Sequence, residues 1–396
     1  MSIKSVPDDI GSEEFANWLQ SLRRDIHRHP ETAFKEERTS NLVANLLESW
    51  GLVLHRGLAK TGIVATLHGK RGPGRTIGLR ADMDALFIDE KNNFKHKSCQ
   101  QGVMHACGHD GHTAMLLGAA RLLAKNPDFK GTVQFIFQPA EESEGGGRVM
   151  IEEGLFDMFP CDAVYAVHNA PGLPTGDFAI RSGPMLAAGD TWEVEFSGSG
   201  GHGAMPHTAT DPITAAGAFI NTVSTIVARN VPSSEAAVLS IGHIHAGDYN
   251  SPNIIPGNVL IRGTARSFTA ETRDLLEDRL HCLADHNARA FQCEAAFRFI
   301  RRYPPLVNRQ DQVDIAAQAA RHVAGDDRVT TDIDPIGGSE DFAFMLEEVP
   351  GAYMLIGNGP GPFVHSDTYD FNDDILLTGV RYWMALVSME LDGQTS

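Results

Sequence analysis

The stretch Thr132-Val-Gln-Phe-Ile-Phe-Gln-Pro-Ala-Glu-Glu142 joins a run of apolar residues to two adjacent carboxylates. Residues 133–137 are almost continuously apolar, and residues 163–167 repeat the pattern further along the chain. Continuous apolar runs of this length are typical of strands buried on both faces, as in a sheet that is covered by helices. These two runs therefore predict an α/β fold.

The surrounding sequence extends this pattern. Residues 62–68 and 76–80 are typical of short strands, and 38–50 and 110–125 have the apolar spacing of helices. Ser12 precedes a further run with helical spacing and is a residue type that caps helices. Strands that alternate with helices indicate one α/β sheet for the first part of the chain.

The pattern changes after about residue 185. Strand patterns at 191–197, 236–243, 259–267 and 294–301 alternate with helical patterns at 211–229 and 271–291. The order β-α-β-β-α-β is that of a ferredoxin-like module. Helix and strand patterns of the first kind resume after the Pro-Pro pair at 304–305. We therefore expect a discontinuous domain of residues 1–186 and 304–396, with a separate domain of residues 187–303 inserted into it.

Composition excludes several classes of function. The chain has 396 residues, with 33 Lys and Arg against 51 Asp and Glu, so its net charge is −18. Such a surface repels phosphate backbones and anionic lipids, which disfavours binding to nucleic acid or to membranes. The five cysteines form no disulfide framework, and the N-terminus lacks the features of a signal peptide. We expect a soluble cytoplasmic protein.

The densest group of chemically active residues is Met104-His-Ala-Cys-Gly-His-Asp-Gly-His112. Cys107 and His109 are two positions apart, so both side chains can point at one ion in an extended or turn backbone. Thiolate and imidazole suit borderline-soft divalent metals. The alternative is a loop whose histidines cap a helix, with Cys107 as a small buried residue.

The adjacent carboxylates of Glu141 and Glu142 follow an expected strand directly. Ligand sites in open α/β sheets lie beyond the carboxyl ends of strands. One carboxylate could bind a metal while the other faces a water molecule as a general base. The alternative is a solvated acidic turn, since Glu144 and three glycines follow.

His168 also ends an apolar run, and His365 lies in a loop before the last expected helix. With Cys107, His109 and Glu142 they make five residues of ligand type, more than the four of a tetrahedral structural site. Such a set suits two metal ions that share a ligand or a water molecule. Asp84, which follows another strand, could orient an imidazole ligand, or it could cap the next turn.

Seven motifs occur in an order that resembles a known family. They are Arg24-Asp-Ile-His-Arg-His-Pro-Glu31, Gly78-Leu-Arg-Ala-Asp-Met-Asp-Ala85, Met104-His-Ala-Cys-Gly-His-Asp110, Gln138-Pro-Ala-Glu-Glu142, Gly200-Gly-His-Gly-Ala-Met-Pro-His207, Gly338-Ser-Glu-Asp-Phe342 and Tyr369-Asp-Phe-Asn372. Together they resemble the amidohydrolase branch of the aminoacylase/carboxypeptidase metallopeptidase family. That branch includes hippurate hydrolases, N-acyl-amino-acid amidohydrolases and auxin-conjugate hydrolases.

The resemblance implies a mixed-sheet catalytic domain that holds two divalent metal ions, with an inserted ferredoxin-like lid that dimerises. It implies the metal ligands Cys107, His109, Glu142, His168 and His365, with Cys107 as the bridge. Glu141 becomes the general base, and His202 stabilises the oxyanion. The residues that it implies for the substrate carboxylate are Asn258, Arg266, Gly338 and Ser339.

The implied reaction is hydrolysis of an N-acyl amino acid to a carboxylic acid and a free amino acid. The ions are expected to be Mn²⁺ or Zn²⁺, with Co²⁺ or Ni²⁺ as alternatives, and the assembly a homodimer or homotetramer. Phe87 and Ala170 depart from the family pattern, which usually has Pro and a bulky aromatic residue there. Both departures leave the acyl group open.

Two other functions are compatible with the residues. Cys107 could be the nucleophile of a thiol hydrolase, with a nearby histidine as base. The chain could also be a binding protein that holds a metal or an amino-acid derivative without turnover. A chelator would abolish activity in the metal-dependent enzyme and spare it in the thiol hydrolase.

Overall fold

The computed structural model describes residues 9–392, which form two compact units. The first unit contains the described residues up to Gly183, then Val307–Asp334 and residues 341–392. The second contains Pro184–Leu306 and Pro335–Glu340. The last of these segments packs with the second unit although it lies outside the insertion at 187–303 that the sequence predicts.

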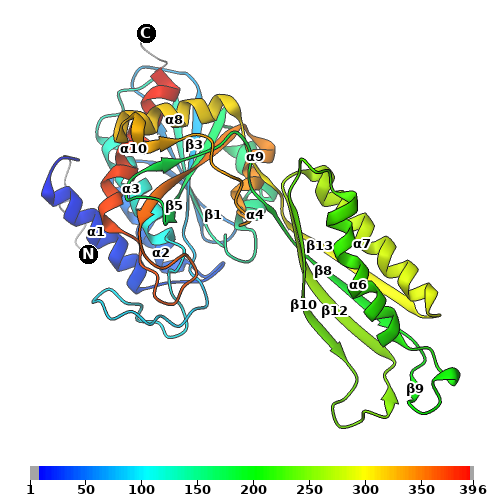
Figure 1. Cartoon of the computed structure of the whole chain (residues 1–396). Helices are drawn as coiled ribbons and strands as arrows, with labels where there is room; N and C mark the ends of the chain where they lie inside the picture. Colours follow the sequence, from blue (N-terminus) through cyan, green and yellow to red (C-terminus); the bar gives the residue numbers. More distant parts are fainter. Residues whose placement is uncertain (1–8, 393–396) are drawn as a thin grey trace. The chain divides into compact units, whose positions relative to one another are not determined.

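The first unit is built on a mixed β-sheet (Figure 1). Its strand order is β1-β2-β4-β3-β5-β16-β6-β15 within the described part of the chain. The central strands β4, β3, β5 and β16 are parallel to one another, whereas β1, β2 and β4 pair in antiparallel fashion. The strands span Val53–Leu58 (β1), Gly62–His68 (β2), Thr76–Asp82 (β3), Thr132–Gln138 (β4), Ala163–Pro171 (β5), Phe178–Ala179 (β6), Val329–Thr330 (β15) and Gly351–Gly359 (β16).

The apolar run that follows Thr132 is buried on both faces of this sheet. Val133, Phe135, Ile136 and Phe137 are all completely buried in β4, although successive side chains of a strand point to opposite faces. The α/β fold with a mixed sheet is therefore confirmed.

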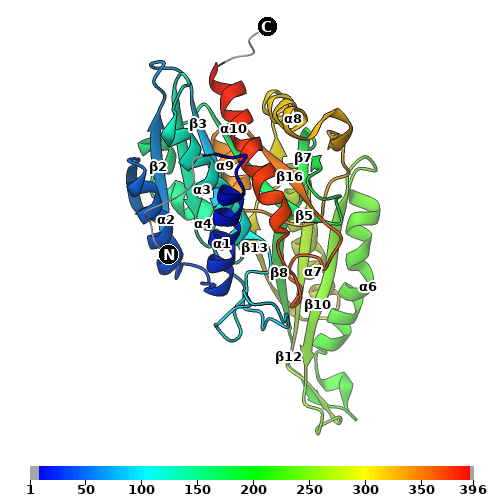
Figure 2. The same ribbon diagram turned by 90° about the vertical axis from the view of Figure 1, so that its left-hand side faces the viewer.

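Helices cover the sheet. Their bounds are Glu13–Arg28 (α1), Glu37–Ser49 (α2), His109–Lys125 (α3), Gly146–Glu152 (α4), Leu155–Met158 (α5), Gln310–Ala324 (α8), Phe342–Glu348 (α9) and Leu376–Asp392 (α10), with 3₁₀ turns at Asp326–Arg328 and Asp373–Ile375. The α3 helix packs against α1, α2 and α10, and α10 also contacts α8 (Figure 2). Ser12 caps α1 as predicted, because the Phe15 amide donates to its hydroxyl at 3.1 Å.

The second unit has the predicted order β-α-β-β-α-β. Its antiparallel sheet has the strand order β10-β12-β8-β13, and α6 and α7 lie side by side on it (Figure 1). These elements span Ala188–Ser197 (β8), Pro212–Asn230 (α6), Ala237–Ala246 (β10), Asn258–Ser267 (β12), Ala270–Ala290 (α7) and Glu294–Tyr303 (β13). Shorter elements of the second unit are Gly201–His202 (β9), Pro206–Thr208 (3₁₀) and Ile254–Ile255 (β11). The short strands Gly183–Leu186 (β7) and Leu306–Asn308 (β14) pair with each other where the chain passes between the units.

One hydrophobic core holds the second unit together. Side chains from the inner face of the sheet, among them Trp192 and Phe196, pack against Phe219 of α6 and Leu276 of α7. Trp192 and Phe219 meet edge to face with ring centroids 6.0 Å apart. The ferredoxin-like module is thus an independent packing unit.

None of the helices formed by residues 9–392 is long and apolar enough to cross a membrane.

Candidate metal centre

The parallel strands β4 and β5 bring carboxylates and an imidazole to one edge of the sheet. Glu141 and Glu142 follow the end of β4 after two residues, and His168 lies in the second half of β5. Because these strands point the same way, the residues at their carboxyl ends lie at the same edge.

The start of α3 adds the thiol and a second imidazole. Cys107 and His109 flank Gly108, whose φ of +99° is a left-handed conformation. A Cβ atom at this glycine would lie 1.9 Å from Oδ1 of Asn169. Only glycine fits between Cys107 and His109, and the turn directs both side chains to the sheet edge.

The loop between β16 and α10 supplies His365. This residue has a φ of +67°, which is uncommon for a residue with a side chain. Its backbone amide donates to the carbonyl of Ala106 at 2.7 Å, so the loop is fastened to the segment that precedes Cys107.

The five predicted ligands come together in overlapping groups whose donor atoms lie within 4.8 Å of one another. The groups that contain Cys107 or Glu142 are Cys107 with His109 and His168, Cys107 with Glu142 and His365, and His109 with Glu141 and Glu142. The thiol of Cys107 belongs to the first two groups. One thiol between two sets of ligands is the arrangement that a bridging ligand requires.

Single distances support this grouping. Nε2 of His168 is 3.4 Å from Sγ of Cys107, and Nε2 of His365 is 3.3 Å from Oε2 of Glu142. Nε2 of His109 is 3.8 Å from Oε1 of Glu142.

Two buried ligand atoms test whether a metal fits. Nε2 of His109 and Oε1 of Glu142 are buried, and neither has a hydrogen-bond partner among the described residues. Buried polar atoms without partners are costly and rare in native proteins. A cation bound to both atoms would remove this cost, so the donors fit divalent metal ions.

The electrostatics of the candidate centre also favour bound cations. Burial raises the pKa of Cys107 well above its usual range, and the carboxylates of Glu142 and Glu141 raise it further. A thiolate at this position therefore needs a cation beside it. Burial, with His112 close by, holds the pKa of His168 well below its usual value, so this imidazole is in the neutral, metal-binding form.

His109 shows the strongest demand for positive charge. Burial acts to lower its pKa, but the carboxylates of Asp82 and Asp84 outweigh burial and raise it to about 10. The position favours a positive charge on Nε2, and a bound metal ion would take the place of that proton.

Asp84 positions two of the candidate ligands. Nδ1 of His109 donates to Oδ1 of Asp84 at 3.2 Å, which leaves Nε2 free to face the centre. The backbone amide of Glu142 donates to Oδ2 of the same carboxylate at 3.0 Å. Asp84 thus affects the candidate metal centre indirectly, by orienting His109 and Glu142.

His112 lies close by but has both ring nitrogens occupied. Nδ1 is 2.6 Å from Oδ1 of Asp82, and Nε2 is 2.7 Å from Oδ1 of Asn169. The side-chain nitrogen Nδ2 of Asn169 in turn donates to the Tyr369 hydroxyl. These contacts give His112 a supporting role, and sequence reasoning did not single out Asn169.

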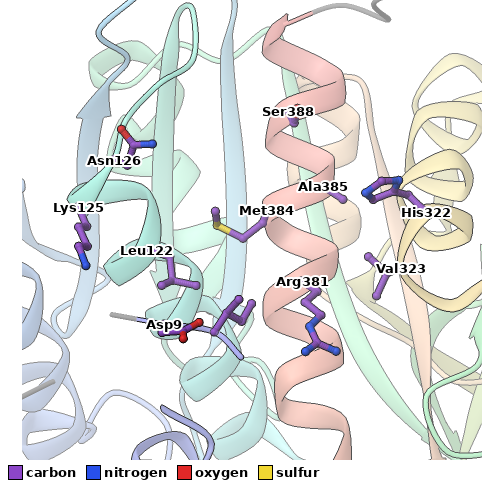
Figure 3. A pocket seen from close by; sticks show the side chains of 11 residues that line it. Asp9, Leu122, Lys125, Asn126, His322, Val323, Arg381, Met384, Ala385 and Ser388 are labelled. Carbon is purple, nitrogen blue, oxygen red and sulfur yellow. The ribbon is translucent and has the colours of Figure 1, made fainter. Parts of the chain in front are cut away.

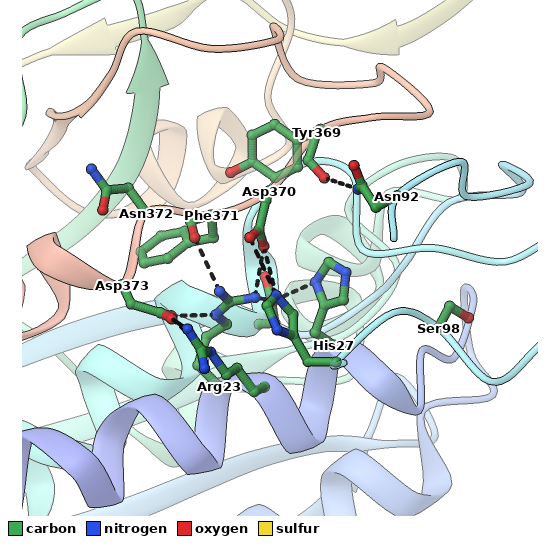
Figure 4. A network of polar contacts seen from close by, with 12 residues as sticks. Arg23, His27, Asn92, Ser98, Tyr369, Asp370, Phe371, Asn372 and Asp373 are labelled. Carbon is green, nitrogen blue, oxygen red and sulfur yellow. Dashed lines mark hydrogen bonds and ion pairs between the residues drawn. The ribbon is translucent and has the colours of Figure 1, made fainter. Parts of the chain in front are cut away.

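A second buried polar network holds the His365 loop against α1 (Figure 4). Arg23 is fully buried and donates to Asp370 at 2.9 Å and to Asp373 at 2.7 Å. His27 contacts Asp110 at 2.9 Å and Glu90 at 3.3 Å. Sequence reasoning quoted motifs that contain His27, Asp110 and Asp370, but Arg23 lies just before the first of them and was given no role.

The predicted residues of the second unit lie at two ends of its sheet. His202 in β9 pairs with Ile254, and Asn258 begins β12. Arg266 lies near the other end of β12. A strand rises about 3.4 Å per residue, so eight residues separate Asn258 from Arg266 by about 27 Å. Asn258 and Arg266 of one chain therefore do not reach the same small carboxylate.

Arg266 and Ser339 lie near each other instead. A Cβ atom at Gly189 would be 2.4 Å from Oγ of Ser339 and 3.9 Å from Nη1 of Arg266. The carbonyl of the neighbouring Gly338 accepts from the Ala187 amide at 2.9 Å. Oγ of Ser339 is buried and has no hydrogen-bond partner within residues 9–392.

A cavity of about 760 Å³ lies at the opposite end of α3 (Figure 3). Leu122 and Lys125 line it at the end of the helix that His109 begins, together with side chains of α8 and α10 and with Asp9 and Ile10. Sixteen residues of helix separate His109 from Lys125 by about 24 Å. This cavity is therefore distinct from the metal centre.

Comparison with known proteins identifies the family. The model of peptidase family M20/M25/M40 matches residues 78–389. The chain belongs to this family. It is 39% identical over 368 residues to the hippurate hydrolase of Campylobacter jejuni, covering 93% of this chain and 95% of that protein. It is 35% identical over 385 residues to the N-acetylcysteine deacetylase of Bacillus subtilis, covering 97% and 99%.

Solved structures agree with this assignment. A dinuclear metal binding peptidase of family M20 from Bacillus subtilis superposes with a TM-score of 0.85 at 32% identity, covering 96% of this chain and 99% of that one. The predicted family resemblance and fold are confirmed. The protein is a metal-dependent amidohydrolase of this family.

We expect Asp84→Asn to weaken metal binding by about 10- to 100-fold, the usual effect of losing a partner that orients a ligand. The measurement is metal content after dialysis against graded concentrations of a chelator. Asp162→Asn is the matched control, because Asp162 also accepts a backbone amide, that of Thr76, at an exposed site. Equal metal retention by the two variants would contradict the positioning role.

Folding stability should fall in alkaline solution because of His27. Burial acts to lower its pKa, but the carboxylates of Asp110 and Glu90 raise it from 6.5 to about 9. The resulting stabilisation, about 3 kcal/mol, is fully present below pH 6.5 and is lost as the pH rises through about 9.

Urea unfolding of the wild type and of His27→Gln, at pH 6 and at pH 9.5, measures this effect. The wild type should lose more stability between the two pH values than the variant does. If both lose the same amount, His27 is not the titrating group.

Proposed function

We propose that this amidohydrolase cleaves the amide bond of N-acyl amino acids and releases a carboxylic acid and a free amino acid. In this proposal Cys107, His109, Glu142, His168 and His365 hold two divalent metal ions, and Glu141 is the general base. One observation carries it. A carboxylate oxygen of Glu141 lies within 4.8 Å of donor atoms of His109 and Glu142, whereas both groups that contain Cys107 form without it. A buried carboxylate that the ions do not require is available to move a proton.

The named relatives support the substrate class. Hippurate and N-acetylcysteine, in the names of two of them, are both amino acids that carry an acyl group on nitrogen. The acyl group that this chain prefers stays open, because Phe87 and Ala170 depart from the family pattern.

The residues of the chain divide the chemistry between them. When bound, two divalent ions would lower the pKa of a water molecule and polarise the carbonyl of the substrate. Glu141 would take the proton from this water on a carboxylate oxygen and later deliver it to the leaving amine nitrogen. The Ala204 amide donates to Nδ1 of His202 at 3.1 Å, so the neutral ring carries its hydrogen on Nε2. That hydrogen would be donated to the oxyanion.

The free carboxylate of the substrate would bind to Arg266 and Ser339. A guanidinium group suits a carboxylate, and the buried hydroxyl of Ser339 lacks another partner among the described residues. Gly338 would contribute by placing Ser339. Asn258 belongs to the opposite end of β12, close to His202.

The spacing of these residues favours an oligomer. One small substrate cannot touch both ends of a strand that separates Asn258 from Arg266 by about 27 Å. We therefore propose a homodimer, or a homotetramer built from it, in which His202 and Asn258 of one copy serve the centre of another.

The remaining assignments rest on sequence. We propose residues 1–186 and 304–396 as the catalytic domain and 187–303 as the lid and dimerisation domain. Mn²⁺ or Zn²⁺ are the proposed ions, with Co²⁺ or Ni²⁺ as alternatives. Cysteine usage supports a cytoplasmic location.

A thiol hydrolase with Cys107 as nucleophile is disfavoured, because burial raises the pKa of this thiol well above its usual range. A binding protein without turnover would have no use for the second carboxylate of the Glu141–Glu142 pair.

We expect Glu141→Gln to keep its metal content and lose at least about 100-fold in kcat, the usual scale for removing a general base. The assay measures free amine released from a panel of N-acyl amino acids by metal-loaded enzyme, with elemental analysis of the same sample. Glu144→Gln is the control, since Glu144 is exposed in the same turn. Undiminished turnover by Glu141→Gln would remove Glu141 from its role, and activity that survives a chelator would favour the thiol hydrolase.

We expect Arg266→Gln to raise KM for N-benzoylglycine by about 10- to 100-fold, because a charge-assisted hydrogen bond to the carboxylate is lost. The KM for N-benzoylglycinamide, which has no carboxylate, should be unchanged. Arg262→Gln, on the same strand, is the control, since Arg262 instead pairs with Glu193 at 3.1 Å. Equal effects of Arg266→Gln on both substrates would exclude carboxylate recognition by Arg266.

A further inference from the structure

Glu36 is a buried acid that the chemistry described so far does not use. Its side chain is completely buried at the start of α2. Oε1 accepts from the backbone amides of Phe34 at 3.1 Å and Ala140 at 3.0 Å, and Oε2 accepts from the Thr61 hydroxyl at 2.7 Å. One carboxylate therefore ties three separate segments of the first unit together.

Helix capping does not account for Glu36. Its side chain accepts no amide from the first turn of α2. The amides of Arg38 and Thr39 donate instead to the carboxylate of Glu31, at 2.9 and 2.8 Å. The contact with Ala140, more than 100 positions away, is thus a separate function of Glu36.

The cost of burying Glu36 is not offset by a cation. Among the described residues no basic side chain forms an ion pair with it, and burial raises its pKa to about 7. Burying a carboxyl group without a basic partner costs free energy. The three hydrogen bonds of Glu36 therefore indicate a functional role for this residue.

Ala140 is the residue that needs support. Its φ of +56° is left-handed, a conformation that residues with a Cβ atom disfavour. The Gly146 amide closes the turn by donating to its carbonyl at 2.9 Å. The side chain of Glu141 leaves the backbone directly after this strained residue.

Both neighbours of Glu141 are held by buried carboxylates. The Ala140 amide donates to Glu36, and the Glu142 amide donates to Oδ2 of Asp84 at 3.0 Å. Rotation of the backbone at Ala140 would swing the Cα–Cβ bond of Glu141. The direction of the Glu141 side chain is therefore set from both sides.

We propose that Glu36 is a positioning residue for the hydrolysis: its carboxylate holds Ala140 in the left-handed conformation and so aims Glu141 at the water molecule. This inference rests on the proposed role of Glu141 as general base. It adds a requirement that lies outside the metal ligands and the residues for the substrate.

The test compares kcat, KM and metal content of Glu36 variants with the wild type on one N-acyl amino acid. Glu36→Met keeps the length of the side chain but accepts no hydrogen bond. It should lower kcat per metal-loaded enzyme by about 10- to 100-fold, because small displacements of a catalytic group have effects of this size. KM should stay within about threefold and the metal content should be unchanged.

Glu36→Gln provides the rescue. Its amide oxygen can accept from both backbone amides while its NH₂ group donates to the Thr61 hydroxyl. Its kcat should stay within about threefold of the wild type. Glu36→Asp, which withdraws the oxygens by one methylene, should behave like Glu36→Met and decides the question if the methionine variant does not fold.

Glu390→Met is the matched control. Glu390 is also a buried glutamate, bonded to the Tyr165 hydroxyl and to Arg75, but it lies in α10. This variant should lose stability while its kcat per folded, metal-loaded enzyme stays unchanged. A merely structural role for Glu36 would make Glu36→Met behave in the same way.

The outcomes separate this inference from the proposed function. Wild-type kcat in Glu36→Met or Glu36→Asp overturns it, and so does a kcat in Glu36→Gln as low as in Glu36→Met. Glu141→Gln is measured in the same assay. If that variant keeps its turnover, the role of Glu141 itself fails; if it is inactive while Glu36→Met has wild-type kcat, only the positioning role of Glu36 fails.

Discussion

Buried negative charge at one edge of a sheet is the constraint on which the first unit depends. Asp82, Asp84 and Glu141 are almost completely buried near the ends of β3 and β4. Carboxylates lose much hydration when they are buried, so each needs a cation or several hydrogen bonds. Arg80 donates to Asp82 at 2.7 Å. Asp84 accepts from the His109 imidazole and from the Glu142 backbone amide. Nε2 of His109 and Oε1 of Glu142 have no hydrogen-bond partner among the described residues, and cations from outside the chain would complete the balance there.

The backbone around this charge adopts conformations that most residues avoid. Gly108, Ala140 and His365 all have positive φ values, and each lies within two residues of a proposed ligand or is one. Such conformations persist only where surrounding contacts enforce them, and they concentrate at functional sites. Gly108 lies against the side chain of Asn169. The Ala140 amide donates to the carboxylate of Glu36, and the His365 amide donates to the carbonyl of Ala106. The geometry of the centre is therefore set by groups that are not themselves ligands.

Local patterns in the sequence predicted much of the fold. The Ser12 cap, the apolar run of β4 and the β-α-β-β-α-β order of the second unit depend on neighbours within a few residues, so they can be read from the chain. The sequence did not delimit β16, because glycines begin and end this strand and its apolar run is limited to residues 352–356. Nor did it find Arg23 or Glu36, because their partners Asp373 and Ala140 are 350 and 104 residues away.

The types of candidate ligand were determined by the sequence alone, because carboxylates and an imidazole follow two apolar runs, while the Cys-Gly-His motif precedes a helical pattern. Tertiary structure decided how those groups combine. Only the packing of β4, β5 and α3 puts Cys107 in two ligand groups. Only the length of β12 separates Asn258 from Arg266, and only a long-range hydrogen bond connects Glu36 to the turn of Glu141. Distances between segments far apart in the chain depend on how the elements pack, and no local pattern encodes them.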